Sequence, residues 1–153
     1  PEGNAPYWIS NPLAKQLSHK WRTEEAAILI GSQTYLDDHP QLNARLWSGS
    51  NPQPVVIDRR GRLTDVPQHW MHLGCCTAEE AVRALHEAKL QSVIVEGGRK
   101  ILDAFIETGL WDEIRLIRAS HELGSGLESP KVPQHSRSVT ENISDNTITY
   151  YYR

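Results

Sequence analysis

The sequence lacks a hydrophobic run long enough to cross a membrane, and it lacks a basic stretch followed by an apolar stretch at its start. A membrane-spanning helix needs about 20 predominantly apolar residues, and a secretory signal has that basic-then-apolar order. We therefore expect neither a membrane segment nor export, and we expect the protein to be located in the cytoplasm.

Cysteine is scarce: only Cys75 and Cys76 occur, next to each other. Neighbouring cysteines rarely bridge each other, and there is no second pair to complete a zinc site. The histidines show no spacing typical of metal ligands. We expect reduced thiols in a reducing compartment, and no metal site.

No face of concentrated positive charge is evident, because 16 Lys and Arg residues are scattered among 19 Asp and Glu residues, for a net charge of −3. This balance argues against nucleic acid as the main partner, whereas a small phosphorylated ligand needs only one or two well-placed arginines. A Gly-x-Ser-x-Gly elbow and a Walker-type phosphate loop are also missing, so hydrolase and NTPase functions lack support.

Short apolar runs alternate with helical patterns, which is typical of an α/β domain with a mainly parallel sheet. Strands are expected at 26–31, 54–58, 91–96 and 114–118, and helices at about 12–21, 32–38, 77–89 and 99–109. Ser10-Asn11-Pro12 predicts a capped helix start, Thr77 and Glu80 predict a capping box, and Gly109 predicts a left-handed stop. The β-branched and aromatic stretch 147–153 is expected to pair antiparallel with 139–143. The whole chain, 1–153, is expected to form a single domain.

Glu96, Gly97 and Gly98 follow one of these strands and precede a helix. Ligands of open α/β sheets bind at the carboxyl ends of the strands. Glycines let the backbone approach a phosphate, and a helix N-terminus offers unpaired N–H groups with a partial positive charge. The motif predicts an anion site with Glu96 as a hydrogen-bond acceptor beside it; the alternative is a tight turn with an exposed Glu.

Two more stretches carry residues suited to ligand binding. The segment 31–45 follows a strand and reaches the same edge of the sheet, with Asp38 and Arg45 near its end. Trp8 is suited to stacking on a flat ring, and Arg22 to holding a phosphate with two hydrogen bonds. Taken singly, these residues also fit a solvated helix end, a core tryptophan and surface arginines.

In their order along the chain, these motifs resemble a known family. The similarity is to the reductase domain of the bifunctional riboflavin-biosynthesis deaminase–reductase, and it lies in Trp8-Ile9-Ser10, Arg22, Ala27-Ile28-Leu29-Ile30-Gly31-x-x-Thr34-x-x-x-Asp38-x-Pro40-x-Leu42-x-x-Arg45, Val95-Glu96-Gly97-Gly98, Gly109-Leu110-x-Asp112-Glu113 and Leu123-Gly124. The resemblance implies a dihydrofolate-reductase-like α/β fold, with a mostly parallel central sheet flanked by helices and antiparallel C-terminal strands. It also implies NADPH-dependent reduction of 5-amino-6-(5-phosphoribosylamino)uracil to 5-amino-6-(5-phosphoribitylamino)uracil, by a homodimer.

The resemblance further implies binding roles for individual residues. On the substrate side these are Arg22, Leu42, Arg45 and Glu96. On the cofactor side they are Trp8, Thr34, Asp38, Arg59, Gly97, Gly98, Arg99, Lys100, Ile101 and Leu102. Arg59 is the residue expected to meet the 2′-phosphate that distinguishes NADPH. Because the cofactor carries the difficult chemistry, no protein nucleophile is expected, and no catalytic acid is identified.

The sequence departs from the family pattern at several places. The usual opening strand, Lys-x-Ala-x-Ser-x-Asp-Gly, is not found before Trp8, and 62–76 looks short for the additional strand usual there. A zinc deaminase domain, which the bifunctional relatives carry upstream, is absent from this chain. The missing opening strand leaves open a non-catalytic nucleotide-binding module. A related reductase of the same fold with another substrate is a further alternative.

Overall fold

The computed structural model describes residues 9–74, 77–121, 126 and 128–153. In chain order its elements are α1 (Pro12–Glu24), β1 (Ala27–Gly31), α2 (Ser32–Asp38), β2 (Gln53–Asp58), β3 (Met71–Gly74), α3 (Ala78–Glu87), β4 (Val93–Gly97), α4 (Arg99–Glu107), β5 (Glu113–Arg118), β6 (Arg137–Ile143) and β7 (Asn146–Tyr152). The expected helices and strands are confirmed, with small shifts at their ends. Within the described ranges, no helix is long and apolar enough to span a membrane. Trp8, Cys75, Cys76 and Leu123-Gly124 lie outside the described residues.

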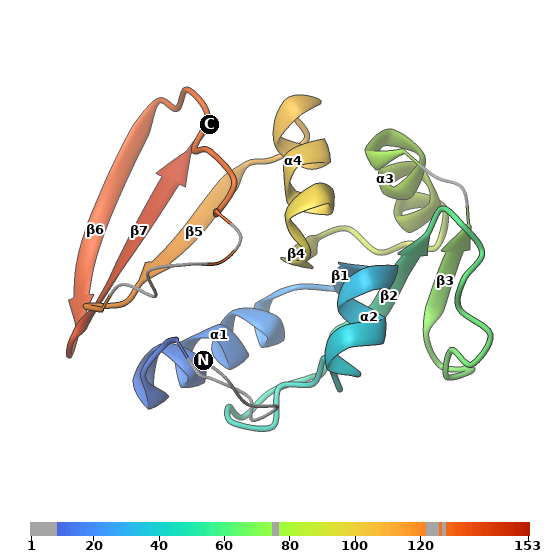
Figure 1. Cartoon of the computed structure of the whole chain (residues 1–153), viewed down its shortest axis with the longest axis horizontal. Coiled ribbons are helices and arrows are strands. Elements are labelled where there is room, and N and C mark those ends of the chain that lie inside the picture. The colour runs from blue at the N-terminus through green and yellow to red at the C-terminus, as the bar shows by residue number, and fades with distance from the viewer. Residues whose placement is uncertain (1–8, 75–76, 122–125, 127) are drawn as a thin grey trace.

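The strands form two sheets (Figure 1). The first has the order β3-β2-β1-β4, and all its pairings are parallel. The second has the order β5-β7-β6, and its pairings are antiparallel. A turn through Ser144, whose φ of 58° is left-handed, joins β6 to β7. The expected arrangement of a parallel sheet with antiparallel C-terminal strands is confirmed.

The expectation that 62–76 is too short for a further strand is wrong. β3 occupies four residues there and pairs in parallel with β2, from Val55 opposite Met71 to Asp58 opposite Gly74. Met71 and Leu73 are partly buried while His72 and Gly74 are exposed, which is the alternation of a half-buried edge strand. Four residues are enough for β3, because one face and one edge of this strand remain unpacked within the described residues.

Both faces of the parallel sheet are covered, which explains why β1 is buried along its whole length. On one face, residues of β1 and β2 pack against α3 and α4 in a cluster of Ala27, Leu29, Val55, Ile57, Ala78, Ala81, Leu85 and Phe105. On the other face, the cluster comprises Ile28, Ile30, Leu42, Val56, Leu63 and Trp70. Each fully buried aliphatic side chain contributes about 1.5–3 kcal/mol through the hydrophobic effect.

Helix α1 is anchored to the second sheet through its N-cap, Asn11. The Asn11 Oδ1 accepts a hydrogen bond from the Ala14 N–H at 2.8 Å, as the Ser10-Asn11-Pro12 pattern predicts. The Asn11 Nδ2 donates to the Ile143 carbonyl at 2.8 Å, and its backbone N–H donates to Asn146 Oδ1 at 2.8 Å. At the other end of α1, Trp21 meets Tyr150 edge to face. These contacts set the direction in which the last turn of α1 presents Arg22.

Strands β4 and β5 are edge strands within the described residues, because β4 pairs there only with β1 and β5 only with β7. Val93, Ile94 and Val95 of β4 are partly exposed, unlike every residue of β1. A continuous apolar run of this kind is typical of a strand inside a sheet. Strand β4 therefore has the composition of a central strand but the position of an edge strand.

Candidate functional site

Arg22 and Glu96 form a bidentate ion pair between the last turn of α1 and the carboxyl end of β4. The Arg22 Nε donates to Glu96 Oε1 at 2.8 Å, and Nη2 donates to Oε2 at 2.6 Å. The two side chains are only 15% and 23% exposed. Charge-assisted pairs with this two-pronged geometry are among the stronger hydrogen bonds in proteins. The structure thus brings together two of the residues expected on the substrate side.

An irregularity in β4 determines where Glu96 lies. Leu29 pairs with Val95 but Ile30 pairs with Gly97, so the register skips Glu96. An extra residue in a strand redirects its side chain and bends the strand locally. A Cβ at Gly97 would lie 2.6 Å from Ile30 Cγ2, so close packing against β1 requires glycine immediately after Glu96.

Asn43 links the third substrate-side residue, Arg45, to this pair. The Asn43 carbonyl accepts a hydrogen bond from Arg22 Nη1 at 2.8 Å, and its Oδ1 accepts one from Arg45 Nη1 at 2.9 Å. Arg45 itself is exposed. Arg22, Arg45 and Glu96 are therefore connected through one asparagine. Asn43 could not be recognised from the sequence, because no motif or spacing marks it.

Leu42, the fourth substrate-side residue, lies in the core next to this cluster. It is 3% exposed and packs with Ile28 and Ile30 of β1. Its φ of 50° is in the left-handed region, which costs a residue with a side chain about 1–2 kcal/mol. The buried Leu42 side chain anchors the segment that carries Asn43 and Arg45.

His19 is a further residue of the site, and it was not among the residues expected there. It precedes Arg22 by three positions on α1, a spacing that places two side chains on the same helix face. Burial, followed by the charges of Arg22 and Arg45, lowers the pKa of His19 below its ordinary value, while the Glu96 carboxylate and the Asn43 backbone oppose this shift. The imidazole is therefore mainly neutral at pH 7. Its spacing from Arg22 was the one signal in the sequence that pointed to it.

Several of the residues expected on the cofactor side lie together at the start of α4. Gly98 has a φ of 78°, and a Cβ there would lie 3.0 Å from Thr34 Oγ1, so α2 and the β4–α4 turn are in close contact. Within the described residues, no side chain caps the α4 N-terminus, and its first turn contains Arg99 and Lys100 but no acidic residue. Uncapped N–H groups with basic neighbours suit the phosphates of a dinucleotide.

The other cofactor-side residues differ in how they are placed. Ile101 packs against Gly31, where a Cβ would approach its Cγ1 to 2.8 Å, so it holds α4 against the start of α2. Arg99 pairs with Asp103 at 3.3 Å and donates to the Glu128 carbonyl at 3.1 Å. Of the other described residues on the cofactor side, Leu102 is half-buried, whereas Asp38, Arg59 and Lys100 are exposed.

A buried carboxylate at the end of β2 organises the turn that carries Arg59. Asp58 is fully buried, and its Oδ2 accepts a hydrogen bond from the Leu63 N–H at 2.8 Å. Burial opposes ionisation, but hydrogen bonds from the turn backbone and from Ser32 outweigh it and lower the pKa of Asp58. Arg62 donates to Ser32 Oγ at 2.9 Å and so ties this basic turn to the start of α2. The ionised Asp58 therefore holds the arginine-bearing turn in place.

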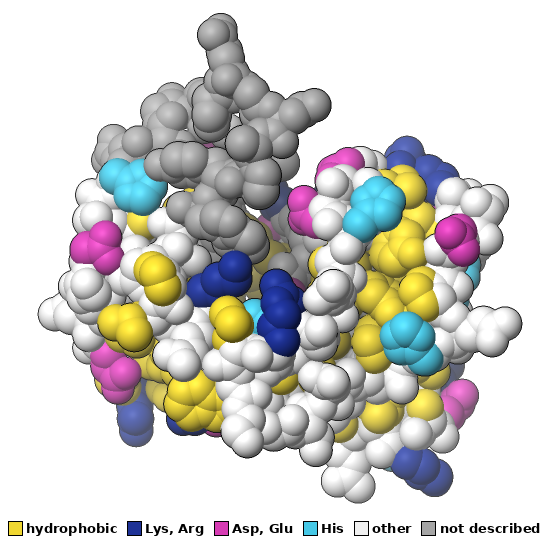
Figure 2. All heavy atoms as spheres, turned by 90° about the horizontal axis from the view of Figure 1, so that it is seen from below, with side chains coloured by type: hydrophobic (Ala, Val, Ile, Leu, Met, Phe, Trp, Pro, Cys, Tyr) yellow, Lys and Arg dark blue, Asp and Glu magenta, His cyan; other side chains and the backbone are white. Residues whose placement is uncertain are grey.

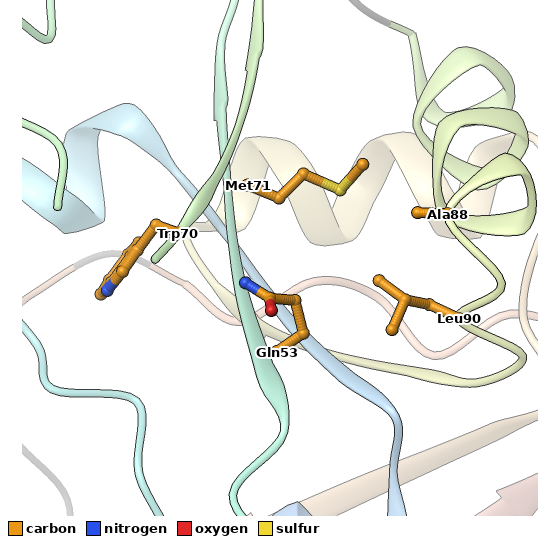
Figure 3. Close-up of a pocket in the computed structure, with 5 residues that line it drawn as sticks. All are labelled: Gln53, Trp70, Met71, Ala88 and Leu90. Carbon is orange, nitrogen blue, oxygen red and sulfur yellow. The ribbon is translucent and has the colours of Figure 1, made fainter. Parts of the chain in front are cut away.

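Figure 2 shows basic side chains gathered around a recess on one face of the molecule. A separate hollow of about 290 Å³ lies near the amino ends of β2 and β3 (Figure 3). It is lined by Gln53, Trp70, Met71, Ala88 and Leu90, of which only Gln53 and Trp70 have polar side-chain atoms. This hollow is at the opposite end of the strands from Glu96 and Gly98. In the part of the chain that is described, no three His, Cys, Asp or Glu side chains are grouped so as to hold a metal ion.

The comparisons with known proteins agree with this arrangement. The sequence model of the RibD C-terminal domain matches residues 1–148. The chain belongs to the RibD C-terminal domain family. The riboflavin biosynthesis protein RibD of Corynebacterium ammoniagenes is 33% identical to this RibD C-terminal domain over 129 residues, which is 78% of the chain and 38% of that protein. The 2,5-diamino-6-ribosylamino-4(3H)-pyrimidinone 5′-phosphate reductase of Eremothecium gossypii is 32% identical over 111 residues, 60% of the chain and 45% of that protein.

Solved structures have the same fold. The deaminase/5-amino-6-(5-phosphoribosylamino)uracil reductase of Thermotoga maritima superposes with a TM-score of 0.79 at 27% identity, over 95% of this chain and 50% of that one. The riboflavin biosynthesis reductase Rib7 of Saccharomyces cerevisiae has a TM-score of 0.74 at 18% identity, over 93% of this chain and 81% of that one, and shows the fold alone. The expected dihydrofolate-reductase-like fold class is confirmed. This RibD C-terminal domain spans less than half the length of the two curated relatives above.

Proposed function

We propose that this domain reduces 5-amino-6-(5-phosphoribosylamino)uracil to 5-amino-6-(5-phosphoribitylamino)uracil with NADPH. One observation supports the proposal above all: Arg22 pairs with Glu96, and Asn43 joins Arg22 to Arg45. Only Gly97 and Gly98 separate Glu96 from the uncapped start of α4. A pair of arginines suits a sugar phosphate, and a helix start beside them suits the phosphates of a dinucleotide. Substrate and cofactor would therefore bind next to each other.

On the substrate side, Arg45 is the accessible cation and Arg22 the fixed one. Arg22 already uses Nε, Nη1 and Nη2 in hydrogen bonds, and Glu96 offsets its charge. Arg45 is exposed, and the Arg22–Glu96 ion pair does not offset its positive charge. We assign the first contact with the substrate phosphate to Arg45 and its final orientation to both arginines. Glu96 would accept hydrogen bonds from the substrate, with Leu42 supporting the segment from the core.

On the cofactor side, bound NADPH would supply a hydride to the ribose carbon that carries the amine, and the sugar would open to a ribityl chain. The close approach of backbone at Gly97 and Gly98 leaves room for its phosphates at the α4 N-terminus. The first turn of that helix contributes Arg99, Lys100, Ile101 and Leu102 to this side. Thr34 and Asp38 of α2 would contact the same cofactor, together with Trp8. The choice of NADPH over NADH is proposed from Arg59, an arginine suited to a 2′-phosphate.

The two separate sheets bear on the domain organisation. We propose that residues 1–153 form a single reductase domain whose sheets are the two halves of one sheet, with the family's opening strand between β4 and β5. The unpaired edges of these two strands and the apolar composition of β4 support this arrangement. Buried edges without a partner would leave backbone N–H and C=O groups unsatisfied.

The assembly and its surroundings are also proposed from the family. We expect a homodimer in the cytoplasm, and a zinc deaminase domain in the same polypeptide, since the Thermotoga maritima relative is described as both a deaminase and a reductase. The small phosphorylated pyrimidine is then the main partner, and neither nucleic acid nor a membrane is expected to bind. Sedimentation of the purified protein tests the dimer.

The decisive experiment is turnover of the named substrate. Purified protein should oxidise NADPH only when 5-amino-6-(5-phosphoribosylamino)uracil is present, and the product should gain two hydrogen atoms by mass spectrometry. The matched control is the same pyrimidine nucleoside without its phosphate, which should react poorly. NADPH binding without turnover would overturn the proposal in favour of a non-catalytic module. Equal rates with and without the phosphate would instead point to another substrate.

A further inference from the structure

Arg62 belongs to the turn after β2, yet two hydrogen bonds attach its head group to the first turn of α2. Its Nη1 donates to Gln33 Oε1 at 2.9 Å, and its Nη2 donates to Ser32 Oγ at 2.9 Å. The Gln33 amide is itself oriented, because its Nε2 donates to Asp37 Oδ1 at 2.8 Å. The guanidinium is therefore held in a defined direction by an element far from it in the sequence.

The backbone on either side of Arg62 is also fixed. Before it, the Gly61 N–H donates to the Asp58 carbonyl at 3.2 Å. After it, the Leu63 N–H donates to Oδ2 of the buried Asp58 at 2.8 Å, and the Leu63 side chain is buried in the core. A long side chain loses less entropy on binding a ligand when its backbone and head group are already ordered.

The positive charge of Arg62 is not offset by an ion pair. Its two acceptors, Ser32 Oγ and Gln33 Oε1, are neutral, and among the described residues no ion pair involves Arg62. Arg22 differs, because Glu96 neutralises it. Arg62 is exposed, and its remaining N–H groups, on Nε and on both terminal nitrogens, are left for a ligand. A fixed planar fork of this kind suits a phosphate group.

The position of Arg62 in the fold relates it to the cofactor side. Ser32 follows β1 directly, and β1 pairs in parallel with β2, so that Gly31 lies opposite Ile57. On its other side β1 pairs with β4, which leads into the α4 N-terminus. Two strand spacings, about 10 Å, therefore separate the end of β2 from the end of β4. A dinucleotide with its pyrophosphate at α4 needs to extend across only one ribose to place a 2′-phosphate near Arg62.

We propose that Arg62, held by Ser32 and Gln33, is a specificity-determining residue that binds the 2′-phosphate of NADPH. Arg59 belongs to the same turn, and Arg62 adds to it a guanidinium that is oriented before the cofactor arrives. NADH has a hydroxyl group where NADPH has this phosphate, so only NADPH offers an anion to the fork. The inference rests on the proposed function, because it takes the ligand at this edge of the sheet to be a dinucleotide.

Three substitutions separate a fixed fork from positive charge in general. Arg62→Gln removes the charge, and Arg62→Lys keeps the charge but loses the planar fork. Arg60→Gln is the matched control, because Arg60 is an exposed arginine of the same turn. The probes are adenosine 2′,5′-bisphosphate, adenosine 5′-monophosphate and ribose 5-phosphate, and calorimetry gives the Kd of each. Because both positions are exposed, the variants should fold, which urea unfolding checks.

The wild-type protein should bind the bisphosphate about 10- to 100-fold more tightly than the monophosphate, the range for charged hydrogen bonds. Arg62→Gln should remove most of this preference, and Arg62→Lys should weaken bisphosphate binding about 3- to 10-fold. Arg60→Gln should stay within about 2-fold of the wild-type protein for every probe. Equal losses for the two adenosine phosphates in Arg62→Gln would overturn the proposal, as would an equally impaired Arg60→Gln. A loss confined to ribose 5-phosphate would overturn it too, because Arg62 would then belong to the substrate side.

Turnover separates this inference from the proposed function. If Arg62→Gln abolishes a preference for the bisphosphate in a protein that does not turn over the pyrimidine, the inference is supported and the proposed reaction is not. If the wild-type protein reduces the pyrimidine with equal kcat/KM for NADPH and NADH, the inference is overturned and the reduction stands. A wild-type protein that binds both adenosine phosphates equally overturns the inference whatever its turnover.

Discussion

Glu96 holds Arg22 with two hydrogen bonds, of 2.8 and 2.6 Å, from the carboxyl end of β4 to the last turn of α1. The remaining terminal nitrogen of Arg22 is bound to the Asn43 carbonyl. The guanidinium is thus oriented before any ligand arrives, which lowers the entropy lost on binding. The same two hydrogen bonds join α1 to β4 and make the ion pair part of the fold as well as of the site.

The contribution of this ion pair to stability can be measured with a double-mutant cycle of Arg22→Met and Glu96→Gln. We expect a coupling energy of about 1.5–3 kcal/mol in urea unfolding, the range for hydrogen bonds to charged groups. The control cycle uses Lys20 and Glu24, an exposed pair at 3.6 Å on the same helix, where about 0.3–0.5 kcal/mol is expected. Equal coupling in the two cycles would show that Arg22 and Glu96 are not held as described.

Replacing Arg45 tests the phosphate contact. Because Arg45 is exposed and lies at the end of the chain of contacts through Asn43, Arg45→Ala should leave stability nearly unchanged. The KM for the phosphorylated pyrimidine should rise about 10- to 100-fold, as expected for the loss of charged hydrogen bonds. The Kd of NADPH should be unaffected, and Arg83→Ala, at an exposed position of α3, should change neither constant. An equal loss of substrate and NADPH affinity would refute the assignment.

Gly98 tests the cofactor side. Its φ of 78° makes Gly98→Ala strained by about 1–2 kcal/mol, and the added Cβ would stand 3.0 Å from Thr34 Oγ1. The Kd of NADPH should rise about 10-fold, measured by fluorescence titration, because the backbone at the α4 N-terminus shifts. The control is Gly109→Ala at the other end of the same helix, where φ is 69°. That variant should lose similar stability with no change in NADPH affinity.

The protonation of His19 predicts how stability depends on pH. Its pKa in the folded protein is below the ordinary 6.5, so the unfolded chain binds more protons than the native one once the pH falls below that value. Stability should therefore decline from about pH 6.5 downward, until the folded-state pKa is reached. The His19→Gln variant should show a flatter profile in this window by chemical denaturation. A profile identical to that of the wild-type protein would mean that His19 titrates normally.

Local features were predictable from the sequence because their causes lie within a few residues. The capping box of Thr77 and Glu80 forms as expected, with the Thr77 N–H donating to Glu80 Oε2 at 2.8 Å. The left-handed stop at Gly109 is likewise confirmed, with a φ of 69°. In both cases the deciding hydrogen bonds or backbone angles belong to neighbours in the chain.

The features that were missed depend on contacts between distant segments. The extra residue at Glu96 exists because β1 and β4 change register there, and Asn43 matters only because α1 brings Arg22 to its carbonyl. Asp58 looked like a strand end, but the backbone of the following turn and Ser32 of another element make it a buried, ionised carboxylate. Such pairings require the tertiary structure, although the family resemblance placed Arg22, Arg45 and Glu96 on one side in advance.

The unpaired edges of β4 and β5 allow a last prediction. If the family's opening strand belongs between them, extending this chain at its N-terminus with a strand of the pattern Lys-x-Ala-x-Ser-x-Asp-Gly should raise Tm by about 5 °C or more, since each kcal/mol shifts Tm by several degrees. Amide protons of Val93, Val95, Ile114 and Leu116 should exchange more slowly, because a new neighbour would pair with both strands. The control is an extension of equal length with proline at alternate positions, which cannot pair. Equal Tm and exchange rates for the two extensions would show that no added strand pairs between β4 and β5.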